Sequence, residues 1–196
     1  MDSLELMASG LWHNGFAAEI GDALGRASRL CFNLNAISPE NKSERESIIR
    51  DLFGEIGDRF IINSPFRCDI GYNIHAGDNL ICNFNVSILD EAEVRVGDNV
   101  FIGPGTTICT ITHALDFRQR NEGIMHSAPV TIGSNVWIGA GVTVLPGVTI
   151  GDGTVIGAGS LVTKDIPSGV LALGSPCRVV REITEADVVT DIHCPD

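Results

Sequence analysis

The sequence predicts an all-β solenoid preceded by a helical N-terminal segment, and three observations carry this prediction. Aliphatic residues recur at every sixth position, glycines follow many of them, and small or β-branched residues recur four positions after each aliphatic. A helix does not sustain this pattern, because each internal glycine costs about 1 kcal/mol relative to alanine. A flat strand has a period of two and needs no such regular glycines. Short strands joined by turns and stacked coil on coil satisfy all three observations.

The N-terminal segment, residues 1–57, shows helical periodicity instead of the six-residue repeat. Residues 1–10 suit a short helix closed by Gly10, and residues 18–35 place apolar side chains on one helical face. A third helix is expected within residues 38–57, where a Ser-Pro pair gives a start signal and two glycines give stop signals. Short amphipathic helices need a surface to pack against. We therefore expect these three helices to cap the solenoid.

Residues 58–184 form the predicted main domain, and residues 185–196 form a C-terminal tail. One six-residue series has a single gap: Val96, Ile102, Ile108, Ile132, Ile138, Val144, Ile150, Ile156 and Val162. An earlier series contains Ile70, Ala76, Cys82 and Ile88. We expect these side chains to point inward, while Gly, Asp and Asn take turn conformations with positive φ.

The gap in the repeat predicts a loop that protrudes at about residues 112–129. From Ile108 to Ile132 is 24 residues, or four repeats, so the coil resumes in phase after a polar stretch without periodicity. A smaller insertion of two residues separates Ile88 from Val96. Insertions on one side of a solenoid often carry ligand sites.

The overall composition disfavours several classes of partner and location. A formal net charge of −12 disfavours binding to nucleic acid, whose phosphates it would repel. No apolar run is long enough to span a membrane, and the acidic N-terminus lacks the features of a secretory signal. Six cysteines without a CxxC pair suit reduced thiols. These features predict a cytoplasmic protein.

His113 stands at the root of the predicted loop and is the first candidate for chemistry. A neutral imidazole accepts a proton near pH 7, which suits a general base acting on a hydroxyl. The alternative is a loop histidine that makes an ordinary structural hydrogen bond. His126 is a weaker candidate in the same loop, and His75, within a coil, reads as structural. Neither lies at a short ligand spacing from His113, which disfavours zinc, and no GxSxG motif supports a serine hydrolase.

Several segments resemble the maltose/galactoside O-acetyltransferases, and the maltose type more closely. They include "PFRCDIGYNIHAGDN", "NFNVSILDEAEVRVGDNVFIGPG", "THALD" and "GSPCRVVREI", and the likeness runs from about residue 8 to residue 184. The resemblance implies a left-handed parallel β-helix with a helical cap. It also implies direct transfer of an acetyl group from acetyl-CoA to a sugar hydroxyl, without a metal, in a homotrimer whose sites lie between subunits.

The same resemblance implies roles for the acceptor site. His113 matches the catalytic base, and Asn83 matches the residue that helps to stabilise the oxyanion and touches the acceptor. Asp69, Glu91 and Met125 match positions that contact the acceptor. Galactoside enzymes have serine where Asp69 stands and aspartate where Glu91 stands. Asn14 stands where the family has a sugar-binding aspartate.

For the donor, the resemblance implies a CoA groove along the solenoid. The matching positions are Trp137, Ala140, Ala158, Thr163, Lys164, Arg178 and Arg181. Only two lysines occur in this acidic chain, so the cations near its C-terminal end would meet the CoA phosphates. The alternative reading of these cations is solvated surface charge, and Trp137 and both alanines also satisfy the repeat.

Two further functions compatible with the sequence are acyl transfer to a non-sugar acceptor and a non-catalytic β-helix that serves assembly or small-molecule binding. His113 together with Asn83 favours the acetyltransferase.

Overall fold

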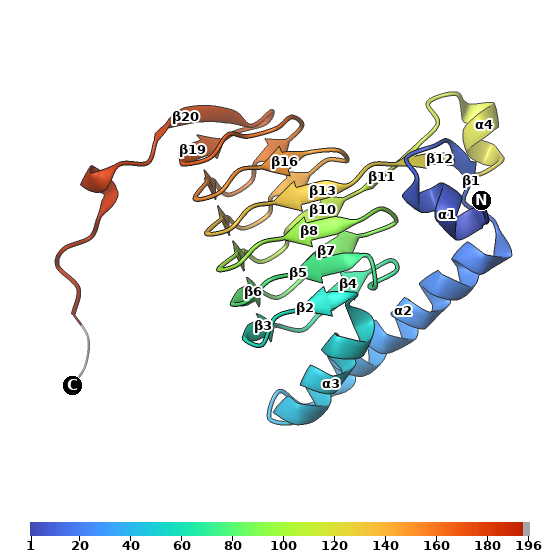
Figure 1. Ribbon diagram of the computed structural model, residues 1–196, viewed down its shortest axis with the longest axis horizontal. Coiled ribbons are helices and arrows are strands. Elements are labelled where there is room, and N and C mark those ends of the chain that lie inside the picture. The colour runs from blue at the N-terminus through green and yellow to red at the C-terminus, as the bar shows by residue number, and fades with distance from the viewer. Residues whose placement is uncertain (194–196) are drawn as a thin grey trace.

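A computed structural model describes residues 1–193 and contains a parallel β-helix with a helical cap at one end (Figure 1). Three parallel sheets form the faces of the solenoid, and the chain passes from face 1 to face 2 to face 3 in each coil. Face 1 contains β2 (Glu55–Ile56), β5 (Ile74–Ala76), β8 (Val94–Val96), β13 (Val130–Ile132) and β16 (Thr149–Ile150). Face 2 contains β3 (Phe60–Ile62), β6 (Leu80–Cys82), β9 (Phe101–Ile102), β14 (Trp137–Ile138), β17 (Val155–Ile156), β19 (Val170–Leu173) and the antiparallel β20 (Arg178–Glu182). Face 3 contains β4 (Phe66–Cys68), β7 (Val86–Leu89), β10 (Thr107–Cys109), β15 (Thr143–Val144) and β18 (Leu161–Val162).

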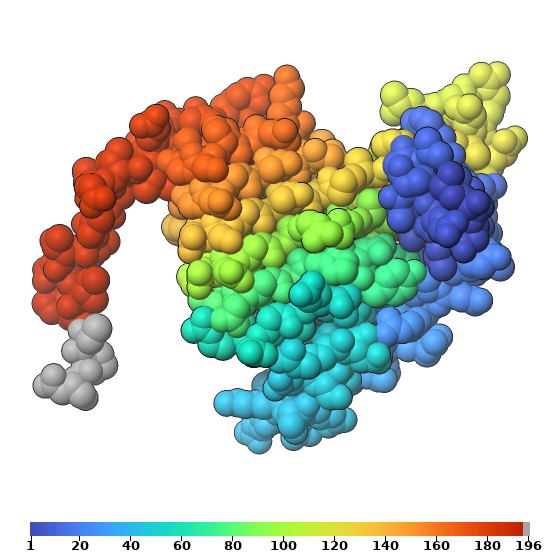
Figure 2. Space-filling view, in the orientation of Figure 1, coloured from blue at the N-terminus to red at the C-terminus, as the bar shows by residue number. Residues whose placement is uncertain are grey.

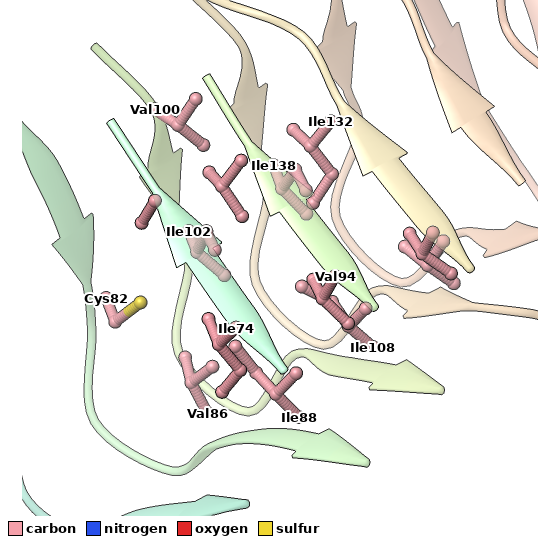
Figure 3. Packing of buried hydrophobic residues seen from close by; sticks show 14 of the residues in the cluster. Ile74, Cys82, Val86, Ile88, Val94, Val100, Ile102, Ile108, Ile132 and Ile138 are labelled. Carbon is pink, nitrogen blue, oxygen red and sulfur yellow. The ribbon is translucent and has the colours of Figure 1, made fainter. Parts of the chain in front are cut away.

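The aliphatic series predicted to point inward fills the core of the solenoid. Ile138 and Val144 are fully buried, and Ile132 is only 1% exposed. Equivalent residues stack in register, so that Ile138 pairs with Ile102 below it and with Ile156 above it. Figure 3 shows this packing of side chains from all three faces. The prediction of an inward aliphatic column is confirmed.

The second inward column, four positions after each aliphatic, is also buried: Val136, Val142, Val148, Thr154 and Ser160. Turn residues take the left-handed conformation that the repeat predicts, including Asn135 at φ 60° and Gly141 at φ 65°. Small inward residues and left-handed turns together let each coil close within about 18 residues, from Ile132 to Ile150.

One assignment in the earlier series is wrong. Cys68, not Ile70, pairs with Ile88 and continues the column of face 3. Ile70 is instead buried in a small separate cluster with Met7 and Ile20 of the cap. The first coil therefore carries an insertion of its own after β4, and Ile70 lies within that insertion.

The insertions all fall on the same edge of the solenoid, where face 3 turns into face 1; we call it the 3–1 edge. They follow β4, β7 and β10 in three successive coils. The third is the long loop, which forms a hairpin of β11 (Ile111–His113) and β12 (Ile124–Ser127) with α4 (Phe117–Asn121) at its tip. Figure 1 shows this hairpin projecting from the solenoid beside the cap.

The cap contains α1 (Ser3–Ala8), α2 (Ala18–Ala36) and α3 (Lys42–Leu52), close to the predicted helices. Ala27, Cys31 and Leu34 of α2 join the main hydrophobic core. Asn41 occupies the N-cap position of α3, so this helix begins later than the Ser-Pro signal suggested. A short strand, β1 (His13–Asn14), leaves the cap and pairs with β12 of the loop. The domain boundary at residue 57 stays a prediction, since α3 is followed directly by β2 at Glu55.

The C-terminal residues leave the solenoid after β20. A short 3-10 helix, η1 (Glu185–Asp187), follows, and Figures 1 and 2 show the segment standing clear of the body. The predicted tail at 185–196 is therefore described up to residue 193, and its last three residues lie outside the described part. Within residues 1–193, no helix is long and apolar enough to cross a membrane.

Candidate active site

The three insertions on the 3–1 edge carry three of the acceptor-site residues predicted from the sequence. Asp69 directly follows β4, Glu91 lies two residues after β7, and His113 ends β11 just beyond β10. Each residue therefore belongs to a successive coil of the same edge. Asp69 also lines a cavity of about 380 Å³ between α2 and face 3. The solenoid fixes the positions at which these side chains leave the core.

The loop hairpin positions His113. In the hairpin register His113 lies opposite Met125, and β1 places His13 on the other side of the same methionine. Met125 is only 8% exposed, whereas the His113 side chain is exposed. His126, the weaker candidate, packs its ring against Trp12, with ring centroids 5.3 Å apart. The three-stranded sheet of β1, β12 and β11 therefore presents His113 to solvent and holds Met125 beside it.

Asn14 has a structural partner in the loop. Its Nδ2 donates to the carbonyl of Glu122 at 3.1 Å, and its Oδ1 accepts from the backbone N–H of Phe16 at 2.8 Å. The amide thus ties the cap to the end of the loop, beside the sheet that carries His113.

Asp69 and Glu91 are two carboxyl groups whose pKa values are both raised. Burial, and secondly the charge of Asp90, raises the pKa of Asp69 to about 6. Burial, followed by the charges of Asp69 and Asp90, raises the pKa of Glu91 to about 7. Glu91 is 7% exposed, and its Oε2 is buried without a hydrogen-bond partner among residues 1–193. An acceptor hydroxyl would supply the missing donor.

Asn83 lies on a different edge, where face 2 turns into face 3; we call it the 2–3 edge. It follows β6 and occupies the column in which the coils above have Gly103, Gly139 and Gly157. Its Oδ1 accepts from the N–H of Phe84 at 2.8 Å, and Nδ2 makes no hydrogen bond within the described residues. The amide is therefore oriented with its N–H₂ group free to donate.

Asn83 and the 3–1 edge are separated by the width of face 3. Asn83 precedes β7 and Glu91 follows it, and a four-residue strand spans about 13 Å. A general base and an oxyanion donor both have to lie about 3 Å from the reacting atoms. Within one chain, the structure does not bring Asn83 and His113 together.

The predicted donor residues are spread over the upper coils. Ala140 and Ala158 lie one above the other on the 2–3 edge, above Asn83, with the backbone of Ala158 close enough to Gly139 to exclude a side chain there. Trp137 lies on face 2 and is 56% exposed. Thr163 and Lys164 follow β18 on the 3–1 edge.

The two predicted arginines lie on β20, at the end of face 2. Both are exposed. Arg181 makes a bidentate contact with Asp187, at 2.8 and 2.7 Å, which raises its pKa. Arg178 donates to the carbonyl of Cys177 at 2.7 Å. A phosphate group would have to replace Asp187 as the partner of Arg181.

Comparisons with known proteins match both parts of this architecture. The maltose acetyltransferase hexapeptide capping motif matches residues 6–57, and the bacterial transferase hexapeptide (six repeats) matches residues 129–164. The galactoside O-acetyltransferase of Escherichia coli is 46% identical over 162 residues, which cover 83% of this chain and 80% of that protein. The chain belongs to the maltose/galactoside O-acetyltransferase family.

Solved structures of similar proteins agree with this membership. A maltose O-acetyltransferase from Clostridium difficile superposes with a TM-score of 0.92 at 42% identity, covering 94% of this chain and 99% of that one. A hexapeptide-repeat acetyltransferase from Vibrio cholerae, complexed with acetyl coenzyme A, has a TM-score of 0.87 at 37% identity and covers 94% and 100%. The fold is the predicted left-handed β-helix. Like its relatives, this family member is an acetyl-CoA-dependent acetyltransferase, so the non-catalytic alternative is wrong.

One residue that sequence reasoning missed lies between the acceptor positions of this family member. Asp90 is fully buried and directly precedes Glu91. The available signal was its place in the two-residue insertion, where a charged side chain interrupts a hydrophobic repeat.

Proposed function

We propose that the protein transfers the acetyl group of acetyl-CoA to a hydroxyl group of a sugar, of the maltose, glucose or galactoside type, with His113 as the general base. The observation that carries this proposal is the series of insertions in three successive coils, which stacks Asp69, Glu91 and His113 on one edge. The family relatives named for maltose and galactoside acetylation support a sugar acceptor.

In the proposed reaction, the acceptor oxygen attacks the thioester carbonyl carbon while His113 takes the hydroxyl proton. Negative charge develops on the carbonyl oxygen, and the free amide N–H₂ of Asn83 donates to it. The carbon–sulfur bond then breaks, and the proton on His113 passes to the sulfur, giving free CoA thiol and the acetylated sugar. No covalent enzyme intermediate and no metal is required.

The carboxyl groups of Asp69 and Glu91 are proposed to bind the acceptor. Ionised Asp69 and Glu91 accept hydrogen bonds from sugar hydroxyls, and the unpaired Oε2 of Glu91 gains a partner. Met125 lines the same pocket beside His113. Asn14 acts through the loop, because both ends of its amide are already bonded to backbone groups.

The separation of the two edges supports a homotrimer with shared sites. Because His113 and Asn83 of one chain lie on opposite edges of face 3, a neighbouring copy has to bring its Asn83 to this His113. A closed ring of three copies repeats that contact at every junction.

Exposed apolar surface supports the same assembly. The outward positions of face 2 form an apolar ladder in register: Ile61, Ile81, Phe101, Trp137, Val155 and Leu171. The loop tip carries its own exposed apolar residues, Leu115 at 94% and Phe117 at 61%. Docking of one copy's loop on the next copy's face 2 would remove both surfaces from water.

The donor is proposed to lie along the 2–3 edge and face 2. Trp137, Ala140 and Ala158 would contact the pantetheine arm, and the backbone of successive coils would bind its amides. Arg178 and Arg181 would meet the nucleotide end, where cations neutralise phosphates. Thr163 and Lys164 lie on the 3–1 edge and would reach the donor from the neighbouring copy, as the His113 of that copy does. We also propose a cytoplasmic location, which the five free cysteines among the described residues support.

The base role is tested with His113→Ala. Turnover, followed as free CoA thiol with maltose, glucose and a galactoside, is expected to fall by about 10²–10⁴-fold. His126→Ala removes the other histidine of the loop and serves as the matched control. Activity of the His113→Ala chain within a few-fold of wild type would remove His113 from the base role.

The shared site is tested by mixing two inactive chains, His113→Ala and Asn83→Ala. In randomly mixed trimers, about one quarter of the junctions combine an intact His113 with an intact Asn83 from different chains. Co-expression is therefore expected to restore about a quarter of the wild-type activity, and no recovery means that each site belongs to one chain.

A non-sugar acceptor is the second candidate. The observation that favours it is Asn14, which replaces the family's sugar-binding aspartate and is committed to backbone hydrogen bonds. If no sugar in a panel with chitooligosaccharides releases thiol above background while an amino or other hydroxyl acceptor does, this candidate replaces the first.

A further inference from the structure

Asp90 is a buried carboxylate on the 3–1 edge, between Asp69 and Glu91 of the proposed acceptor site, and the proposed chemistry does not use it. Its side chain is fully buried, so it cannot contact a substrate. Its Oδ1 accepts from the backbone N–H of Asp69 at 3.1 Å and of Ile70 at 2.9 Å, and its Oδ2 accepts from Gly71 at 2.6 Å. Three consecutive amides of the neighbouring insertion therefore converge on one side chain.

The insertion after β4 can take this shape only because of its glycine. Gly71 has φ 84°, and a Cβ atom there would lie 2.5 Å from the carbonyl oxygen of Leu52. With no side chain, the backbone turns its N–H inward toward Asp90. The residue that opens this turn is Asp69, so the carboxylate of Asp90 holds the backbone from which Asp69 leaves.

A second contact ties the two insertions together in the opposite direction. The Nδ2 of Asn73 donates to the carbonyl of Asp90 at 2.7 Å and to that of Glu91 at 3.4 Å. Asn73, in the insertion that carries Asp69, thus hydrogen-bonds to the backbone of Glu91. Asp90, in the insertion that carries Glu91, hydrogen-bonds to the backbone of Asp69.

Asp90 acts in its anionic form. Burial raises its pKa, and the amides of Ile70, Gly71 and Asp69 oppose that rise. Both of its oxygens receive N–H donors, and a protonated oxygen would set an O–H against one of those N–H groups. The charge reaches both neighbours, because it contributes, after burial, to the raised pKa of Asp69 and of Glu91.

We propose that Asp90 is a positioning residue for acetyl transfer, whose buried carboxylate fixes the turn from which Asp69 leaves and, with Asn73, locks that turn to the backbone of Glu91. This inference rests on the proposed function, in which Asp69 and Glu91 bind the acceptor. A purely structural Asp90 would influence stability and would leave acceptor binding and the titration of its neighbours alone.

Asp90→Asn tests this role, because asparagine keeps the size, loses the charge and sets an N–H₂ group against the N–H of Gly71. The KM for the sugar is expected to rise about tenfold or more, as for loss of a charged hydrogen bond, while the KM for acetyl-CoA stays within about twofold. In ¹³C carboxyl NMR titrations of the whole protein, the midpoints of Asp69 and Glu91 are expected to move to lower pH. The thiols of Cys68 and Cys109 also lie near these carboxyl groups. The contact with Cys31 and burial raise the pKa of Cys68, and burial raises that of Cys109, so both thiols stay neutral in this pH range.

Two further variants keep the test decisive. Asp98→Asn is the matched control, since Asp98 also accepts from a backbone amide, that of Asp78 at 2.7 Å, but on the edge between faces 1 and 2. It is expected to leave the sugar KM and both midpoints unchanged. If Asp90→Asn fails to fold, Asn73→Ser removes the hydrogen bonds from Asn73 and keeps the charge, so the sugar KM is expected to rise while the midpoints stay.

The outcomes separate the two proposals. A wild-type chain that acetylates no sugar ends the proposed sugar function, whereas the NMR midpoints still report on Asp90. A folded Asp90→Asn chain with unchanged midpoints and an unchanged sugar KM overturns the positioning role. If only Asn73→Ser folds, an unchanged sugar KM in that variant overturns it.

Discussion

Faces 1 and 2 of the solenoid have the same interior and opposite exteriors. Both bury one aliphatic column, and both run through successive coils in parallel register. The outward positions of face 1 are polar: Glu55, His75, Arg95, Thr131 and Thr149. The outward ladder positions on the parallel strands β3 to β19 of face 2 are apolar, and Phe101 and Trp137 are 42% and 56% exposed.

The difference shows what the repeat constrains and what it leaves free. Residues at inward positions have to pack in the core, and this requirement is the same on every face, so their composition indicates only the fold. Residues at outward positions do not have to pack in the core, so their composition indicates whether a face contacts water or a partner. A continuous apolar ladder across six strands indicates a partner surface, whereas face 1 suits water.

The largest effect is expected from a charge on face 2. Phe101→Glu places a carboxylate in the apolar ladder and is expected to cost about 2–4 kcal/mol at each contact of the proposed trimer, enough to dissociate it. Thr131→Glu is the matched change on face 1 and is expected to leave assembly and turnover intact. Sedimentation velocity and thiol release measure both. A Phe101→Glu chain that sediments as a trimer with full activity would contradict the partner role of face 2.

Truncations of core side chains are expected to cost the same free energy of unfolding on face 1 as on face 2. Ile138→Ala on face 2 and Ile132→Ala on face 1 both leave a cavity at a fully or almost fully buried position. Each is expected to destabilise by about 2–5 kcal/mol. Thermal melts at one fixed protein concentration measure the pair. A large loss on one face with tolerance on the other would mean that the two interiors are not equivalent.

The 3–1 edge departs from both faces, because Glu91 and Asp90 are buried there and Asp69 is half-buried. The folded pKa values of Asp69 and Glu91, about 6 and about 7, lie above those of an unfolded chain. Folding therefore favours their protonated forms, and the free energy of unfolding is expected to fall as pH rises from about 4 to about 7. Glu91→Gln should flatten this fall, whereas Glu55→Gln, at an exposed position of face 1, should not. Denaturant titrations across this pH range provide the slope, and an unchanged slope in Glu91→Gln would contradict the burial argument.

The sequence predicts the repeating part of the molecule well, because one periodicity constrains every coil. It misplaces Ile70, since a six-residue step back from Ala76 reaches an aliphatic residue whether or not the chain carries an insertion there. Only contact with Met7 and Ile20 of the distant cap distinguishes the two cases. The start of α3 at Lys42 was also missed. Ser38 and Asn41 are both suitable N-cap residues and lie only three positions apart, so the sequence does not show which of them precedes the helix.

Only part of the candidate site can be argued from the repeat itself. His113 stands out because it lies where the pattern is interrupted, whereas Asn83 and Glu91 are assigned through the family resemblance. Asp90 was not found, because its place in the two-residue insertion does not reveal that its side chain is buried and accepts from three backbone amides. The pairing of β1 with the loop is likewise invisible to periodicity, since it joins residues more than 100 positions apart.

The smallest effect is expected from the charged ladder of face 1. Glu93 contacts Arg95 at 2.6 Å and His75 at 3.6 Å, at exposed or half-exposed positions. Such pairs contribute at most about 1 kcal/mol, and salt screens them. Glu93→Gln is therefore expected to lower the melting temperature by no more than about 4 °C, and less in high salt. Phe101→Ala on face 2 should respond little to salt, because the contact that it weakens is apolar. A Glu93→Gln chain that melts as low as Ile132→Ala would show that face 1 depends on its charges, and the contrast between a solvent face and a partner face would no longer hold.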